Sequence, residues 1–353
     1  MNQNNYSAIT VIDSIINITS HTEKNGLEKS LLLAVNALIP TTDIRLFKVQ
    51  KTGEKHEISL LAFSAKGVIS SSEPEENSHL ISDELTAAFE SISQHRESES
   101  IANADDSGWQ IIYPSFDDHN EIFLILVQSC QKPTVQEQKI VHGVFKIYAN
   151  HVALIEKAHR DKLTGLFNRE TLDDEITKIL LKGSDDLFDV NANDARRNSG
   201  KPRSWLGVID IDHFKLINDN YGHLYGDEVL ILTSRLMTSG CIRDDDLVYR
   251  YGGEEFVVLL KASTEQDAMN AFERLRKIVE QHEFPQVGQI TTSIGFVEIT
   301  TQQTPSDVIG QADGALYYAK NNGRNQTQSY SRLVEQGLMI VSEQVGSSDV
   351  ELF

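Results

Sequence analysis

The stretch RYGGEEF, Arg250 to Phe256, restricts the fold more than any other part of the sequence. It lies between two apolar runs, LVY before it and FVVLL after it. Apolar runs on both sides of a Gly-Gly pair are typical of a β-hairpin, because glycine permits the positive φ angles of a tight turn. Glu254 and Glu255 then project from a rigid corner, in a chain whose formal net charge is already −20. Adjacent like charges repel, so we expect a counter-charge or a cation nearby.

The segment WLGVIDID, residues 205–212, predicts a buried strand with Asp210 and Asp212 at its carboxyl end. Side chains two residues apart in a strand lie on the same face. Ligand sites in α/β sheets collect at the carboxyl ends of strands. A single acid in this place could simply cap the next helix. Together with the hairpin glutamates, a cation site is the better interpretation, and such oxygen ligands suit Mg²⁺.

The charge balance and the cysteines exclude several classes of protein. With 52 Asp and Glu against 32 Lys and Arg, we expect no nucleic-acid partner, although a small anionic ligand stays open. Cys130 and Cys241 form no CxxC pair, which argues against a disulfide framework or a zinc site. No secretory signal and no apolar run near the roughly 18 residues of a spanning helix is visible. We therefore expect a cytoplasmic protein without membrane insertion.

The length of 353 residues predicts two domains, and residues 1–133 read as the first, a mixed α/β domain. It has an apolar helical pattern from Ile9 to Ile16 and a second helix ended by Pro40. The predicted strands are DIRLFKV, EISLLAFSA, WQIIYPSF and EIFLILVQS, and the polar stretch from Ser70 to Ser78 is a loop. In length and element order this domain resembles a GAF-type sensory module, which implies an unknown ligand or a role in dimerisation.

Residues 134–160 predict a long helix that connects the domains. Its seam positions recur every three or four residues, at Ile140, Val144, Ile147, His151, Leu154 and Ala158. One interpretation is a coiled-coil seam that pairs two copies of the chain. The other is a helix lying on its own domain, and the pattern leaves both open.

Residues 161–326 read as a second domain, and residues 327–353 as a polar tail. The polar segment 182–204 predicts a long flexible loop. A strand, two helices, the hairpin, a helix, the strand ITTSIGFVEI and the helix PSDVIGQADGALYYAK follow in that order. The predicted fold class of the chain is α/β (α+β).

Four motifs of the second domain resemble consecutive signatures of the GGDEF family of diguanylate cyclases. They are DKLTGLFNR (161–169), DIDHFKLINDNYGHLYGDEVL (210–230), RYGGEEF (250–256) and YYAKNNGRN (317–325). The resemblance covers about half of the chain in unbroken order. It implies a palm-like fold akin to nucleotidyl cyclases and polymerases. GGEEF here stands in place of the GGDEF of the family name, and the longer side chain still reaches a metal.

The resemblance implies a metal set and a catalytic set. Asp210, the backbone carbonyl of Ile211 and Glu254 would hold Mg²⁺, or Mn²⁺, on GTP. Glu254 would also accept the proton of the attacking 3′-hydroxyl, a role that competes with tight metal binding, and Glu255 is the neighbouring catalytic candidate. Lys215 would lie over the phosphates and stabilise charge in the transition state.

The implied GTP contacts come from the same motifs. They are Phe214, Asn218, His223, Asp227, Gly252, Gly253, Lys320 and Arg324, of which Asn218 and Asp227 would meet the base. One carboxylate can accept both neighbouring N–H groups of guanine, whereas adenine has no ring N–H there. Asp227 could instead be a plain helix N-cap, or serve both roles. Lys320 and Arg324, four residues apart, share one helical face if the last helix extends that far.

The implied reaction joins two GTP molecules into cyclic di-GMP with release of pyrophosphate. Each domain binds one GTP, so two domains of a homodimer must meet face to face. Arg243 and Asp246 form an RxxD placed as in the family's inhibitory product site, with Arg274 as its secondary arginine. A solvated charged turn is the alternative for this RxxD. Two other functions stay open, a non-catalytic receptor for cyclic di-GMP and a structural sensory dimer.

Overall fold

The computed structural model describes residues 8–21, 24–39, 41, 43–52, 55–65, 68–71, 91–92, 99–102, 108–117, 121–188, 202–240, 243, 246–300 and 303–339. The chain divides into two compact units, Met1–Ala158 and His159–Phe353. Each unit has its own hydrophobic core and is described by itself. In the part of the chain that the structure describes, no helix combines the length and the apolarity needed to span a bilayer.

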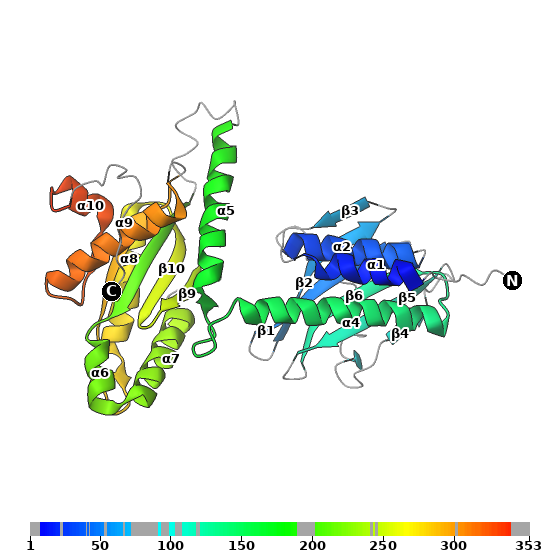
Figure 1. Cartoon of the computed structure of the whole chain (residues 1–353), viewed down its shortest axis with the longest axis horizontal. Coiled ribbons are helices and arrows are strands. Elements are labelled where there is room, and N and C mark those ends of the chain that lie inside the picture. The colour runs from blue at the N-terminus through cyan, green and yellow to red at the C-terminus, as the bar shows by residue number, and fades with distance from the viewer. Residues whose placement is uncertain are drawn as a thin grey trace. The chain divides into compact units, whose positions relative to one another are not determined.

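The first unit is an antiparallel sheet covered by helices on one face (Figure 1). Its elements are α1 (Ala8–Thr19), α2 (Lys24–Leu38), β1 (Asp43–Thr52), β2 (Lys55–Ala65), β3 (Val68–Ser71), β4 (Glu99–Ala102), β5 (Trp109–Phe116), β6 (Ile122–Cys130) and α4 (Val135–Ala158). The strand order is β3-β2-β1-β6-β5-β4. All four predicted strands are confirmed, whereas β3 and β4 were not predicted. The predicted loop from Ser70 begins inside β3, and its residues 72–78 lie outside the described ones.

The helix α4 packs on the first unit. Its buried face consists of Val141, Val144, Phe145, Tyr148, Ala149 and Val152, which join the same apolar core as α1 and α2. Of the predicted seam, Val144 belongs to this buried face, while Leu154 is 64% exposed. His151 is half-buried, with Nε2 3.1 Å from the backbone carbonyl of His21. The structure therefore shows the alternative in which this helix lies on its own domain.

The second unit is a mixed sheet with helices on both faces (Figure 1). Its elements are β7 (Phe167–Asn168), α5 (Arg169–Phe188), β8 (Arg203–Ile211), α6 (Phe214–Tyr221), α7 (His223–Gly240), β9 (Leu247–Gly252), β10 (Glu255–Ala262), α8 (Glu265–Gln281), β11 (Glu283–Phe284), β12 (Gly288–Gln289), β13 (Thr292–Glu298), α9 (Pro305–Asn321), β14 (Thr327–Ser329) and α10 (Tyr330–Glu335). The main sheet has the order β14-β13-β8-β10-β9-β7. The predicted mixed α/β class of this domain is confirmed.

The central strand β8 separates two apolar layers. Trp205, Ile209 and Ile211 point into a core shared with α6, α7 and α8. Leu206 and Val208 point into the opposite core, shared with α5, α9 and α10. Because side chains alternate along a strand, Asp210 continues the second row and faces the α9 side.

Two predicted segments of the second domain differ from the structure in their bounds. The loop expected over 182–204 is shorter, because α5 continues to Phe188 and β8 already begins at Arg203, while 189–201 lie outside the described residues. The polar tail expected from residue 327 begins with ordered structure, since β14 pairs in parallel with β13 and Tyr330 and Leu333 are buried. The three residues Thr-Gln-Ser of β14 carry no apolar signal, so only the pairing with β13 defines this strand. Residues 340–353 lie outside the described part.

Candidate active site

Three predicted site residues converge at the carboxyl end of β8. Asp210 is only 4% exposed, and Glu255 is its direct partner across the antiparallel pair β8–β10. Directly opposed residues point to the same face, so the two carboxyl groups lie on the α9 side of the sheet. From α9, Lys320 places its Nζ 2.7 Å from Oδ2 of Asp210. The counter-charge expected near the hairpin glutamates is therefore present.

The carboxyl groups at this strand end are poorly compensated. Burial raises the pKa of Asp210 to about 6, where the Lys320 ammonium acts against the shift and the charges of Glu254 and Glu255 add to it. Burial also raises the pKa of Glu255, with a further contribution from Asp313, while Lys320 lowers it. One ammonium thus faces several carboxyl groups, an arrangement that favours an additional cation.

The hairpin that carries Glu254 is a tight and anchored turn. Gly253 has φ +48°, a left-handed conformation that glycine adopts without strain. Arg250 donates from Nε and Nη2 to the carbonyl oxygen of Gly253, at 3.2 and 2.9 Å. Its Nη1 donates to both carboxylate oxygens of Asp161, at 3.1 and 3.2 Å. One arginine therefore ties the turn to the first motif of the domain.

Asp161 is itself held in a fixed orientation. Its Oδ1 accepts hydrogen bonds from the backbone N–H and the hydroxyl of Thr164, at 2.8 and 2.7 Å. Burial acts to raise the pKa of Asp161, but the hydrogen bonds from Thr164 and Arg250 bring it below its usual value. The carboxylate stays charged, and the ion pair with Arg250 holds over the ordinary pH range.

A hollow of about 460 Å³ lies beside the hairpin. It is lined by Asp161, Asn168, Arg169, Glu170, Arg250, Tyr251, Gly252 and Gly253. The Arg169 guanidinium lies 4.5 Å from the ring centre of Tyr251. The predicted GTP contacts Gly252 and Gly253 thus border open space, which is compatible with close approach of a ligand to the backbone.

The second aspartate of the strand end has a different environment from the first. Asp212 is 5% exposed, and its carboxylate accepts hydrogen bonds from the hydroxyls of Thr291 and Ser293, both at 2.7 Å. The backbone N–H of Asn325 donates to it as well, at 3.0 Å. Three protein donors already satisfy most of the acceptor capacity of Asp212, so its carboxylate is less available to a cation than that of Asp210.

The helices α6 and α7 carry the predicted contacts to the base. The Oδ1 of Asn218 lies so close to Gly226 that a Cβ there would be 2.0 Å away, so a larger residue at 226 would displace the Asn218 side chain. The half-buried Asn218 is thereby placed next to Asp227. Asp227 is exposed within α7, which begins at His223, so the N-cap alternative for Asp227 is wrong.

The remaining residues of this helix pair differ in exposure. Lys215 and His223 are exposed, at the start of α6 and of α7 respectively. Phe214 is only 6% exposed and belongs to the apolar core, and its contact with GTP stays a prediction.

Lys320 and Arg324 do not share a helical face. The helix α9 ends at Asn321, and Arg324 lies three residues beyond it with φ +57°. The N–H of Arg324 donates to the carbonyl of Ala319, at 3.0 Å, which closes the helix end. The helix does not extend to Arg324, because Gly323 starts a left-handed turn.

Asp246 of the predicted product site is held by backbone hydrogen bonds, and the two arginines of the site are exposed. Asp246 accepts from the N–H of Arg243 at 3.0 Å and from the N–H of Lys261 at 3.2 Å. Arg243 is exposed, and Arg274 is exposed on α8. These contacts fix the carboxylate of Asp246 and leave the product-binding role as a prediction.

The implied metal fits the residues of this strand end. Among the described residues, no three His, Cys, Asp or Glu side chains form a ready-made metal cage. Mg²⁺ is commonly held by one or two carboxylates together with substrate phosphates and water. Asp210 and Glu254 offer two carboxylates, and their mutual repulsion contributes to the raised pKa of Asp210. These donors suit a cation that arrives with a nucleotide.

Several residues of the site were not predicted. Arg250 and Asp161 both lie inside quoted motifs, yet their pairing across 89 positions has no signal in the sequence. Asp313 stands seven residues before Lys320 on α9, a helical spacing that could have indicated a shared face. The contact of Asn325 with Asp212 depends on a left-handed turn that no pattern announced.

Comparisons with known proteins agree with the quoted motifs. The family model for the diguanylate cyclase GGDEF domain matches residues 158–326. The chain is 37% identical over 191 residues to diguanylate cyclase DgcZ of Escherichia coli K12, covering 52% of this chain and 55% of that protein. It is 36% identical over 172 residues to diguanylate cyclase VdcA of Vibrio cholerae, covering 47% of this chain and 45% of that protein.

Among solved structures, the coiled coil and GGDEF domain of DgcB from Caulobacter crescentus, in complex with c-di-GMP, matches with 26% identity and a TM-score of 0.48. That match covers 55% of this chain and 97% of the solved chain. The chain spans about half the length of the curated relatives it matches. The match of the family model identifies residues 158–326 of this chain as a GGDEF domain.

Proposed function

We propose that this protein is a diguanylate cyclase that condenses two GTP molecules into cyclic di-GMP. The 3′-oxygen of one GTP forms a bond to the α-phosphorus of the other, the bond from that phosphorus to the bridging oxygen breaks, and pyrophosphate leaves. Repetition closes the ring. The observation that carries the proposal is the end of strand β8 in a GGDEF domain. There the buried Asp210 meets the half-buried Glu255 and Lys320, beside the turn that carries Glu254.

Asp210, the carbonyl of Ile211 and Glu254 would hold a divalent cation, Mg²⁺ or Mn²⁺, together with the phosphates of GTP. Such an ion neutralises charge on the phosphates and orients them for in-line displacement. Lys320 now places its ammonium against Asp210. On nucleotide binding we expect Lys320 to leave Asp210 and pair with phosphate oxygens instead.

The phosphates would be held by cations from three elements. Lys215 at the start of α6, Lys320 on α9 and Arg324 after α9 are the candidates. Their work is positioning and charge stabilisation, which account for most of the rate in phosphoryl transfer. Glu254 is the candidate acceptor of the hydroxyl proton, and Glu255 lies beside it at the start of β10.

Recognition of guanine would come from Asn218 and Asp227. The carboxylate of Asp227 can accept two neighbouring N–H groups of guanine, and adenine cannot satisfy it in the same way. An acceptor left unpaired in a closed site costs about 1–3 kcal/mol, which favours GTP by roughly one to two powers of ten. Replacement of Asp227 by Asn should therefore reduce the preference for GTP over ATP.

The reaction requires two domains, so we propose that the protein acts as a homodimer. The first unit is the candidate for pairing and for control of the second. On α1, the apolar side chains of Ile9, Ile12 and Ile16 are 54–68% exposed, which supports a contact with another surface. A GAF-like sensory role and an unknown ligand of this unit remain part of the proposal.

Product inhibition through Arg243, Asp246 and Arg274 is a further part of the proposal. Arginine side chains can grip phosphate and guanine edges with two parallel hydrogen bonds. Arg243→Ala should relieve inhibition by added cyclic di-GMP. Inhibition that is unchanged in a turnover assay would remove this site from the account.

Product analysis tests the proposed activity. Purified protein is incubated with GTP and Mg²⁺, and pyrophosphate and cyclic di-GMP are quantified, with Glu254→Gln as the matched control. We expect both products from the wild type and a loss of at least about a thousandfold in the variant, since one carboxylate there serves both metal and proton. Binding of cyclic di-GMP without turnover would instead indicate a receptor.

A further inference from the structure

The loop after α9 has an unusual backbone. Gly323, Arg324 and Asn325 follow one another with φ angles of +112°, +57° and +45°. Residues with a side chain rarely adopt this region, and two in succession require contacts that hold them there. Arg324 is exposed in the middle of this turn, so its direction depends on what fixes the backbone on either side.

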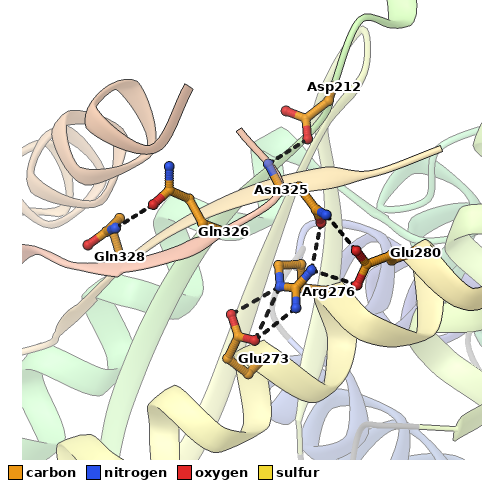
Figure 2. A network of polar contacts seen from close by, with 7 residues as sticks. All are labelled: Asp212, Glu273, Arg276, Glu280, Asn325, Gln326 and Gln328. Carbon is orange, nitrogen blue, oxygen red and sulfur yellow. Dashed lines mark hydrogen bonds and ion pairs between the residues drawn. The ribbon is translucent and has the colours of Figure 1, made fainter. Parts of the chain in front are cut away.

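Asp212 fixes the turn from the side of the strand. Figure 2 shows its carboxylate receiving the backbone N–H of Asn325, at 3.0 Å. Thr291 and Ser293 donate to the same carboxylate and lock its orientation. The bond reaches the residue directly after Arg324, so it acts on the backbone and leaves the arginine side chain available.

Arg276 fixes the same turn from the side of α8. Its Nη1 donates to Oδ1 of Asn325 at 2.6 Å, while the side-chain Nδ2 of Asn325 donates to Oε1 of Glu280 at 2.6 Å (Figure 2). Arg276 is 8% exposed and is bound in turn by Glu273 and Glu280. Asn325 is thus bound at its backbone by Asp212, after β8, and at its side chain by α8.

We propose that Asp212 and Asn325 are positioning residues that aim Arg324 at the nucleotide phosphates. The inference rests on the proposed function, since it takes Arg324 as a phosphate contact. The two strand-end aspartates then each position one of the cations expected to bind the phosphates. Asp210 holds Lys320 in the nucleotide-free protein, and Asp212 holds the turn that carries Arg324. If Asp212 had only a structural role, its replacement would lower stability, and its effect on activity would be the same with and without the Arg324 side chain.

A double-mutant cycle separates these two roles. Arg324→Ala is compared in the wild type and in an Asp212→Ala background, with kcat and KM for GTP, GTP affinity and melting temperature as readouts. We expect Arg324→Ala to lower kcat/KM about 30-fold in the wild type and about threefold or less with Asp212→Ala, a coupling of about tenfold. Should Asp212→Ala fail to fold, Asp212→Asn keeps the side-chain shape and is expected to show weaker coupling of the same sign.

Lys320→Ala in the same two backgrounds is the matched control. Because Asp210 holds Lys320, its loss should have the same effect with or without Asp212. Equal effects of Arg324→Ala in both backgrounds, or coupling of equal size for Lys320, would overturn the inference. A wild type that binds GTP but forms no cyclic di-GMP would refute the proposed function, while the coupling in GTP affinity would still decide the inference. Absence of GTP binding would overturn both.

Discussion

Two clusters of charged side chains in the second unit contain the same kinds of groups and differ in how their charges are compensated. Around Arg276, burial acts to raise the pKa of Glu273, but hydrogen bonds from Arg276 bring it below its usual value. Hydrogen bonds from Asn325 and Arg276 lower the pKa of Glu280. Around Asp210, burial and the neighbouring glutamates raise the pKa to about 6 despite Lys320. The first cluster favours the folded protein, and the second favours binding of an additional cation.

Removing the charge of Asp210 should give the largest change in activity. Asp210→Asn deletes a candidate metal ligand, so we expect turnover of GTP to fall at least about a thousandfold. The pKa of Asp210 is raised in the folded protein, so its charged form disfavours folding near neutral pH, and the melting temperature of the variant should stay equal or rise. Turnover assays and thermal unfolding test both halves. An active variant, or one that unfolds several degrees earlier, would break the contrast between the clusters.

Replacing Arg276 should lower the stability of the protein, in contrast to replacing Asp210. Arg276→Met removes the cation that is hydrogen-bonded to both Glu273 and Glu280, while Lys277 acts on them by charge alone, and we expect the free energy of unfolding to fall by about 3 kcal/mol. Lys277→Met, at an exposed neighbour on α8, is the matched control and should stay within about 0.5 kcal/mol of the wild type. Denaturant unfolding measures both. Equal effects of the two variants would show that the Arg276 cluster is not a stabilising network.

Loosening the hairpin turn should have an intermediate effect on activity. Arg250→Ala removes the bonds to Gly253 and Asp161, so Glu254 loses its fixed position. We expect kcat to fall about 10- to 100-fold, because a displacement of about 1 Å in a catalytic group has an effect of that size. Arg250→Lys should not restore it, since an ammonium cannot form both sets of bonds. Full rescue by lysine would show that only the charge matters.

A change of pH should give the smallest of these effects, and its direction should differ between the two clusters. The pKa of Asp210 in the folded protein, about 6, lies above the ordinary value of an aspartate, so its contribution to stability falls as pH rises from about 4 to about 6. Glu273 and Glu280 have lowered pKa values, so their contribution is lost as the pH falls. Metal affinity should rise with pH up to about 6, by about tenfold per unit below it, because protons compete for Asp210. A metal titration that is flat in this range would contradict the assignment.

Local patterns predicted most of the elements that position the site. The apolar run before Asp210 and the Gly-Gly pair of the hairpin are confirmed as β8 and as the β9–β10 turn. Three short polar residues form β14, and only their pairing with Ile294–Phe296 makes them a strand. In the first unit, Ile9, Ile12 and Ile16 of the apolar face expected on α1 are exposed. The buried face of this helix contains Ser14 and Ile18 instead. Its GAF-like character stays a prediction.

The chemistry of individual acids could not be predicted from spacing. Asp210 and Asp212 read as an equivalent pair, yet one meets an ammonium and the other meets three hydrogen-bond donors. The difference arises from residues far along the chain, Thr291, Ser293 and Asn325, that reach only one of the two. Motif positions identify candidate residues, whereas their partners define what each residue does.

The most direct test is a crystal structure of the protein with a non-hydrolysable GTP analogue and Mn²⁺, whose anomalous signal locates the ion. The account predicts a peak between Asp210 and Glu254, with Lys320 moved from Asp210 to the phosphates. An analogue bound elsewhere, with no ion at the strand end and the Lys320–Asp210 pair intact, would contradict it.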